Sequence, residues 1–243
     1  MNDTARAHRI CTLGRRDPVM TSFSRRIGQS FHVLVVLALA SAAAPSVSAH
    51  PHDDESIAAA RAQALGTTVT VRGTVSVQTN AFDSGFAIQR GGAGIYVLDS
   101  GDAARELGDS VEVTGTLVDT FGLLAIAPSS IVAHGRGARV RPREASTGSV
   151  GEATEGLLLE LEGDMVGDLV DDSPFGFKLD IDDGSGPIQL FLFPGSGIAP
   201  DGLHDGVSIR VVCFSNQFED VFECDPRQPR DFKIKVRHPD CDD

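Results

Sequence analysis

The feature that most constrains this chain is a series of short strand-like segments that occurs twice. In each segment apolar residues alternate with polar ones or run together, and Gly, Asp and Ser separate the segments, which is the pattern of β-strands joined by tight turns. The first set comprises residues 68–77, 85–90, 94–98, 110–118 and 123–131, and the second comprises residues 156–166, 175–181, 188–193, 207–214 and 221–224. Residues 85–89 match residues 176–180 at an offset of 91, and Val111-x-Val113 matches Ile209-x-Val211 at an offset of 98. A repeat at this spacing predicts a duplicated domain.

The number of strands in each set favours one small β architecture. Between its third and fourth strands each set has a short segment with helical or 3₁₀ potential, at residues 103–107 and 198–203. Five strands with such a segment form the five-stranded Greek-key barrel called the OB-fold. An immunoglobulin-like sandwich is the second choice, because it needs about seven strands per domain. We therefore predict an all-β protein of two tandem OB-fold barrels.

Several segments also resemble a known family. They are GTTVTVRGTVSV (66–77), GFAIQ (85–89), GIYVLD (94–99), LGDSVEVTGTL (107–117), TGSVGEATEGLLLELEG (147–163) and DDGSGPIQLFL (182–192). These patterns resemble the tandem OB-fold modules that accompany bacterial extracellular endonucleases and some envelope-attached proteins. The resemblance covers roughly residues 60 to 232 and implies a non-catalytic accessory module, because the nuclease motifs of His, Asp and Asn are missing from this sequence.

The beginning of the sequence predicts export. Residues 33–44 form an apolar run that Arg25 and Arg26 precede and small residues follow, ending at Ala49. This is typical of a signal peptide, and the run is too short to span a bilayer. We expect a start at Met20, cleavage after Ala49, no membrane span after cleavage, and a periplasmic or secreted product. The expected parts are then a leader (1–49), an N-terminal segment (50–65), a first barrel (66–135), a basic linker (136–155), a second barrel (156–232) and a tail (233–243).

Charge restricts where a polyanion could bind. The chain has 21 Lys and Arg against 34 Asp and Glu, a net charge of −13, which repels phosphate backbones. The second barrel holds most of this acidity, whereas the linker carries four arginines, namely Arg136, Arg139, Arg141 and Arg143. We expect the linker either to hold a phosphate chain beside the first barrel or to neutralise the acidic second barrel, and the second option is slightly favoured.

Four residues of the first barrel are the other expected nucleic-acid contacts. Strand alternation places Arg72, Gln89 and Tyr96 on the outer face of the barrel, where OB-folds stack bases on rings and track the backbone with cations. Arg90, which follows Gln89, is the cation that we expect to act together with Tyr96. The alternative for Tyr96 is an ordinary exposed strand residue. Phe82 and Phe121 lie in loops, and we expect them to plug the barrel ends rather than to extend this platform.

Metal and catalytic sites are not expected. The aspartates around Asp182-Asp183-Gly184 do not have the spacing of a Ca²⁺ loop, and Asp-Gly between apolar runs predicts a hairpin. His50 and His52 would begin a copper site, but Pro51 removes the second backbone amide. Catalytic motifs are absent from the sequence, and its histidines are dispersed. We therefore expect no cofactor and no enzyme activity.

The cysteines predict one disulfide. Cys213 and Cys224 end neighbouring strands of the second set, so a cross-strand bridge between them is reasonable in an exported protein. A bridge between Cys224 and Cys241 is the alternative. Two functions remain at this point: a module that binds single-stranded nucleic acid, and a secreted or envelope module that binds another protein.

Overall fold

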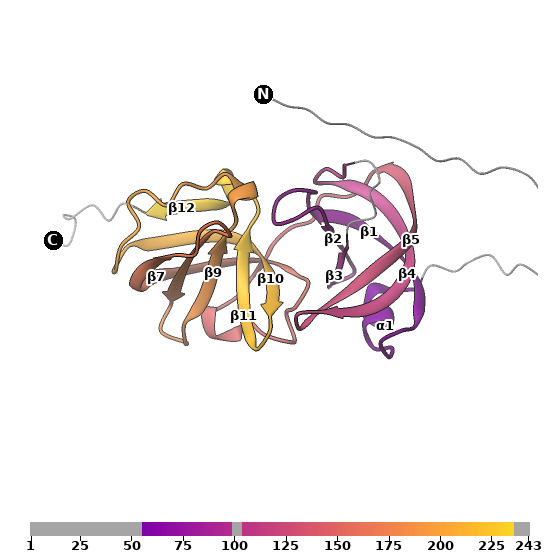
Figure 1. The fold of residues 1–243 in the computed structure, drawn as a ribbon, viewed down its shortest axis with the longest axis horizontal. Helices are drawn as coiled ribbons and strands as arrows, with labels where there is room; N and C mark the ends of the chain where they lie inside the picture. The colour runs from indigo at the N-terminus through magenta and orange to yellow at the C-terminus, as the bar shows by residue number, and fades with distance from the viewer. Residues whose placement is uncertain (1–54, 99–103, 236–243) are drawn as a thin grey trace, which may run out of the picture. The chain divides into compact units, whose positions relative to one another are not determined.

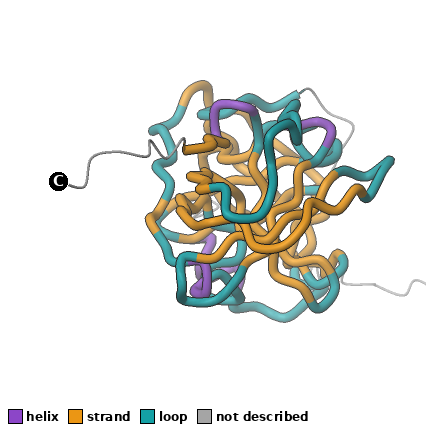
Figure 2. Tube along the Cα trace, turned by 90° about the vertical axis from the view of Figure 1, so that its left-hand side faces the viewer, coloured by secondary structure: helices purple, strands orange, loops and turns teal. Residues whose placement is uncertain are grey.

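A computed structural model describes residues 55–98 and 104–235 of the chain (Figure 1). The expected leader with its start at Met20, the cleavage site after Ala49, the two histidines that follow it and Cys241 lie outside these residues. Strands and the loops between them make up nearly all of the described chain (Figure 2). The strands form two groups, which follow one another along the sequence.

The first group is a closed five-stranded barrel. Its strands are β1 (Thr68–Val77), β2 (Phe86–Arg90), β3 (Ala93–Val97), β4 (Asp109–Thr120) and β5 (Leu123–Arg136). They are hydrogen-bonded in the order β1-β2-β3-β5-β4, and β4 pairs with β1 to close the barrel. All neighbours are antiparallel except β3 and β5, which are parallel. A short helix that the sequence did not predict, α1 (Ile57–Arg61), precedes the barrel, and the Ser56 hydroxyl caps it.

The second group repeats this order. Its barrel strands are β7 (Leu158–Asp171), β8 (Phe177–Asp182), β9 (Ile188–Leu192), β10 (Ser208–Phe218) and β11 (Val221–Pro226). Pairing of β10 with β7 closes the order β7-β8-β9-β11-β10, and β9 and β11 are its parallel pair. Two further strands, β6 (Arg143–Glu144) and β12 (Phe232–Lys235), extend the sheet at β7 and β10. The predicted fold class, all-β with two OB-fold barrels, is confirmed.

The segments that we expected to be helical are not helices. Residues 104–107, the described part of the first segment, have an irregular course that ends in a turn, and residues 198–203 are likewise irregular. A 3₁₀ turn lies earlier in the second connection, at Pro194–Ser196, where the proline begins it and Gly197 ends it in the left-handed conformation. Each expected segment is about one turn long, and Pro200 interrupts the second one, so neither could sustain a helix.

The buried side chains form three clusters rather than two. One fills the first barrel, with Val71, Ile88 and Val113 among its members, and another fills the second barrel around Leu159, Leu190 and Val211. The third cluster contains residues from both barrels, and its members are Val77, Ala81, Ala87, Tyr96, Leu123, Ala125 and Phe214. This third cluster decides which surfaces of the first barrel remain accessible.

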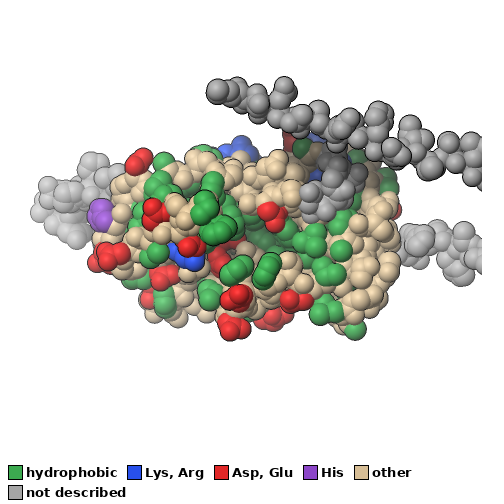
Figure 3. All heavy atoms as spheres, in the orientation of Figure 1, with side chains coloured by type: hydrophobic (Ala, Val, Ile, Leu, Met, Phe, Trp, Pro, Cys, Tyr) green, Lys and Arg blue, Asp and Glu red, His purple; other side chains and the backbone are tan. Residues whose placement is uncertain are grey.

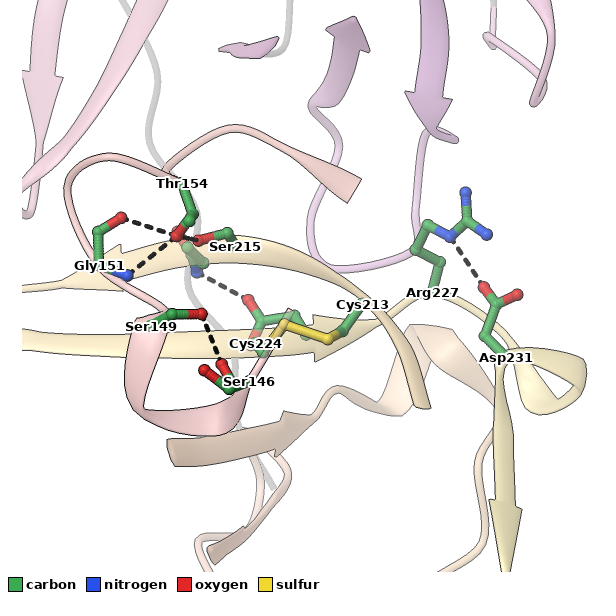
Figure 4. Close-up of a disulfide and its surroundings, with 11 residues drawn as sticks. Ser146, Ser149, Gly151, Thr154, Cys213, Ser215, Cys224, Arg227 and Asp231 are labelled. Atoms are coloured by element: carbon green, nitrogen blue, oxygen red, sulfur yellow. Dashed lines mark hydrogen bonds and ion pairs between the residues drawn. A yellow bond between two sulfur atoms is a disulfide. The ribbon is translucent and has the colours of Figure 1, made fainter. Parts of the chain in front are cut away.

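The disulfide predicted between Cys213 and Cys224 is present (Figure 4). It joins β10 to β11, with the two Cα atoms 5.2 Å apart, and both residues are buried in the core of the second barrel. Close to it, the hydroxyl of Thr154 contacts that of Ser215 at 3.0 Å and donates to the carbonyl of Gly151 at 2.8 Å. The bridge therefore fixes the strand pair that carries Phe214 to the third cluster.

Candidate functional site

Two glycines allow the backbones of the barrels to approach closely. A Cβ atom at Gly94 would lie 1.8 Å from the carbonyl oxygen of Gly156, and one at Gly156 would lie 2.4 Å from the carbonyl oxygen of Gly94. Next to them, Arg61 of α1 forms an ion pair of 2.9 Å with the buried Glu155. The side-chain oxygen of Gln89 accepts a hydrogen bond of 2.9 Å from the backbone N–H of Leu158. The Glu155-Gly156 pair thus belongs to the junction between the barrels.

This junction covers the face that we expected to bind nucleic acid. Tyr96 points away from the core of its own barrel, as strand alternation predicts, but it is only 4% exposed. Its ring lies 5.9 Å from that of Phe214 on β10, and its hydroxyl donates to the carboxylate of Asp83. The pKa of the Tyr96 hydroxyl is raised above its usual value, mainly because the group is buried and also because the Asp83 carboxylate is close. The prediction of an exposed stacking ring at Tyr96 is wrong because the second barrel packs on that face.

The remaining residues of the predicted face are also engaged or lie apart. Gln89 contacts Leu158, as described above, so it is not available as an outer-face contact. Arg72 pairs with Glu112 across β1 and β4 at 2.9 Å, and it also lies 3.3 Å from His134. Arg90 is exposed at the end of β2, before the turn at Gly91. These residues do not form a continuous binding surface.

A basic cavity of about 790 Å³ opens where the linker meets both barrels. Of the residues that the structure describes, five cationic side chains line it, and Asp231 is the single acidic one. The cations are Arg136, Arg139, Arg227, Arg230 and Lys233. Arg136 lies at the end of β5 and Arg139 in the linker. Arg227 and Arg230 lie in the segment after β11, which contains the 3₁₀ turn Pro229–Asp231, and Lys233 lies in β12. We call this site the basic cavity.

Two of the five cations are anchored by hydrogen bonds. The buried Arg227 donates to Asp231 at 2.8 Å (Figure 4). It also donates to the backbone carbonyl of Ser76 in the first barrel. Arg136 donates to Asp109 and to the carbonyl of Leu107, each at 2.8 Å. Two hydrogen bonds lower the pKa of Asp109: the larger effect comes from the backbone N–H of Glu106 and a smaller one from the guanidinium of Arg136. These bonds hold the walls of the cavity together.

The other three cations, Arg139, Arg230 and Lys233, are exposed and extend into the cavity region. Of the linker arginines, Arg136 and Arg139 line the cavity, while Arg141 and Arg143 are exposed further along the same segment. The favoured expectation that the linker neutralises the second barrel is wrong for Arg136, because its ion pairs are with Asp109 and Glu106 of the first barrel. Backbone geometry explains this, since Arg136 ends β5 directly opposite Asp109.

Sequence reasoning missed that the segment after β11 contributes to the site. Arg227, Arg230 and Lys233 follow β11 at intervals of three residues, and Pro229 lies between the first two. The total charge of the second barrel is strongly acidic, and that total hid a local basic segment. The regular spacing of these three cations was the signal in the sequence.

Metal-binding and membrane-spanning features are not seen in the described part of the chain. Among residues 55–98 and 104–235, no group of three or more His, Cys, Asp or Glu side chains is placed to hold a metal ion. Within the same ranges, none of the helices is long and apolar enough to cross a membrane. Asp183-Gly184 lies in the hairpin turn between β8 and β9, as predicted. Hydrogen bonds from Ser185 and Thr147 lower the pKa of Asp183 to about 2.

Comparisons with known proteins give distant structural likenesses. No family model matches the chain, and no curated protein matches it. A murine DNA-binding protein solved with double-stranded DNA is 15% identical, covers 71% of this chain and 99% of its own, and has a TM-score of 0.36. The Ifi202 HINa domain solved with 20-bp double-stranded DNA is 12% identical, with coverages of 70% and 96% and a TM-score of 0.28. The single-stranded DNA-binding protein from Thermus aquaticus is 14% identical, with coverages of 74% and 98% and a TM-score of 0.25.

Proposed function

We propose that this protein binds nucleic acid through the phosphate backbone, and that the basic cavity is the binding site. The observation that carries the proposal is the reversal of charge at this cavity. The whole chain has more acidic than basic residues, yet the cavity lining has five cations and one carboxylate. That carboxylate, Asp231, is buried and paired with Arg227, so the exposed charge of the cavity is positive.

The lining favours backbone contacts over base recognition. Phe232 is its only aromatic residue among those described, and Tyr96 is buried in the junction. Proteins that prefer single strands usually stack several bases on exposed rings. We therefore expect this cavity to bind phosphates of single and double strands alike, which broadens the single-stranded ligand expected from the sequence.

The salt dependence of DNA binding tests this proposal quantitatively. Three exposed lining cations, each contacting one phosphate, give a slope of about −2.7 for log K against log salt with duplex DNA. Binding should then weaken about 40-fold between about 50 and about 200 mM NaCl. Fluorescence anisotropy with a labelled duplex of about two helical turns measures this slope.

Matched substitutions locate the contacts. The double variant Arg139→Gln, Arg230→Gln should reduce the slope to about −0.9, whereas Arg210→Gln removes an exposed cation that does not line the cavity and should leave the slope unchanged. Arg90→Gln tests the barrel face predicted from the sequence, and we expect little effect. An unchanged slope in the double variant, or a larger loss with Arg90→Gln, would refute the proposed site.

We further propose that the protein is exported and acts by binding rather than catalysis, as an accessory module of the type that the sequence resemblance implies. The buried disulfide supports export, because such bonds persist in oxidising compartments. The described histidines support a binding role, since His134 lies beside Arg72 and Glu112 while His204 contacts the backbone of Asp205. N-terminal sequencing of the protein recovered from the producing cells tests export. A product that retains residues 1–49 would contradict it.

A further inference from the structure

A second opening between the barrels has a different chemical character. This groove of about 260 Å³ is lined by six aromatic side chains and by no Lys or Arg among the described residues. The rings are those of Phe82, Tyr96, Phe121, Phe193, Phe214 and Phe218. None of its lining residues belongs to the basic cavity. Apolar side chains gather in the middle of the face shown in Figure 3, and acidic side chains lie along its lower edge. We call this opening the aromatic groove.

The rim of the groove is built from two equivalent hairpins, one from each barrel. The β4–β5 turn carries Phe121 and the β10–β11 hairpin carries Phe218, and these rings stack with their centroids 5.5 Å apart. The two turns are joined by a backbone hydrogen bond from Glu219 to Phe121 and by a bridge between Gly122 and Phe218. The rings are therefore held in a fixed position by their backbones.

Both rings remain largely exposed despite this support. Phe121 is 65% exposed and Phe218 is 51% exposed, so the expectation that Phe121 plugs the end of its barrel is wrong. Phe121 also has a φ of 55°, in the left-handed region where a bulky residue is strained. Its backbone turns the side chain toward the other hairpin instead of toward the barrel core. Phe82, in contrast, packs at 5.1 Å from Phe193 and at 6.0 Å from Phe214, inside the groove.

Among the described residues, every charged side chain of the groove lining and of the two hairpin tips is acidic. Asp83 is in the lining, and the two hairpin tips carry Asp119, Glu219 and Asp220. Residues 118–124 and 216–222, which form these tips, contain no Lys or Arg. Carboxylates around exposed rings repel phosphate groups, and both the carboxylates and the ring faces attract Lys and Arg side chains. The groove therefore suits a cationic partner and not a nucleic acid.

We propose that the aromatic groove is a docking site for a basic peptide segment of another protein, in which an apolar side chain lies next to Arg or Lys. The apolar side chain enters the groove and packs on the half-buried rings of Phe82 and Phe193, below which the Phe214 ring is fully buried. The neighbouring cation lies over the stacked Phe121 and Phe218 rings and near the carboxylates of the hairpin tips. This site would let the protein hold a protein partner and a nucleic acid at separate openings.

Dipeptides that carry the two proposed features test this docking site. The probe is N-acetyl-Phe-Arg-amide, and its matched control is N-acetyl-Phe-Glu-amide, titrated to about 10 mM because single contacts of this size give millimolar affinity. Chemical shifts of the phenylalanine ring signals of the protein report binding. We expect the Arg probe to bind at least about 5-fold more tightly than the Glu control, from one cation–π contact and the acidic rim. We also expect Phe218→Ser to weaken the Arg probe by a similar factor.

Two controls make each outcome decisive. Phe175→Ser removes an exposed ring that does not line the groove, so it should leave binding unchanged. The double variant Glu219→Gln, Asp220→Asn keeps every ring and should lower the preference for the Arg probe, which tests the charges even if Phe218→Ser unfolds. Equal binding of the two dipeptides, no saturation, or stronger binding of thymidine 5′-monophosphate at the same rings would overturn the proposal.

Discussion

Arg61→Met tests whether the buried ion pair at the junction stabilises the association of the barrels. Arg61 joins α1 of the first barrel to Glu155, which precedes β7, and their side chains are 16% and 2% exposed. The variant keeps the length of the side chain but leaves the Glu155 carboxylate buried without its cation. Removal of one partner from a buried pair costs about 3–5 kcal/mol. Glu155 also accepts a hydrogen bond of 3.3 Å from the backbone N–H of Leu124, and this bond favours the lower part of that range.

The expected loss is large enough to measure by thermal and urea unfolding, followed by circular dichroism. For a protein of this size it corresponds to a decrease in Tm of roughly 6–20 °C. Arg210→Met is the matched control, because Arg210 pairs with Glu160 at 2.6 Å while 47% of its side chain is exposed. Such a solvent-exposed pair contributes far less to stability than a buried one. The double variant Arg61→Met, Glu155→Gln should recover part of the loss, since no buried charge remains. Equal losses for Arg61→Met and Arg210→Met would refute the reasoning.

Three further predictions concern stability. Replacing Cys213 and Cys224 by Ser should lower the free energy of unfolding by about 3 kcal/mol, because the bridge closes a loop with a sequence separation of 11. Reduced and oxidised wild-type protein give the same comparison, and equal urea midpoints with and without the bridge would contradict the prediction. Phe214→Ala should cost about 3–5 kcal/mol, because the ring is fully buried, whereas Phe175→Ala on the surface should change the urea midpoint little. Burial and, to a smaller extent, the nearby Glu223 raise the pKa of Asp225 in the folded protein. The folded state therefore keeps a proton that the unfolded state releases, and the free energy of unfolding falls as the pH rises above the pKa of the unfolded state. Asp225→Asn should flatten this pH dependence, and an unchanged slope between acidic and neutral pH would contradict the prediction.

Local sequence patterns were sufficient to predict the barrels. The alternation of Val69 and Val71 with polar residues defines the inner face of β1, and β1 begins and ends where the pattern does. The five-strand order of an OB-fold follows from strand number, and the disulfide follows from strand ends. The additional strands β6 and β12 were not predicted, because each has at most four residues and depends on pairing with β7 or β10.

The site was harder to predict, because it depends on how the two barrels pack. Alternation correctly placed Tyr96 on the outside of the first barrel, but no local pattern shows that Phe214 of the second barrel lies against it. Likewise, Arg136 and Arg230 are far apart in the sequence and line one cavity only in the folded chain. Summed charges per barrel conceal such a site, since the charge that a ligand meets is set by the few side chains that surround it.

Packing of one barrel on the other changes where an OB-fold protein of this kind can bind its ligands. The ring of Tyr96 on the first barrel packs against Phe214 of the second barrel, and Gln89 is hydrogen-bonded to Leu158. The outer face of β2 and β3 is therefore covered and cannot serve as a platform for bases. The two binding sites that we propose are openings that remain beside the junction. One of these openings is lined by cations and the other by rings below a rim of carboxylates. Because their charges are opposite, a nucleic acid attracted to the basic cavity is repelled by the aromatic groove, and the reverse holds for a basic peptide. The two proposed sites thus assign to separate openings two binding chemistries that a single OB-fold face could not hold together.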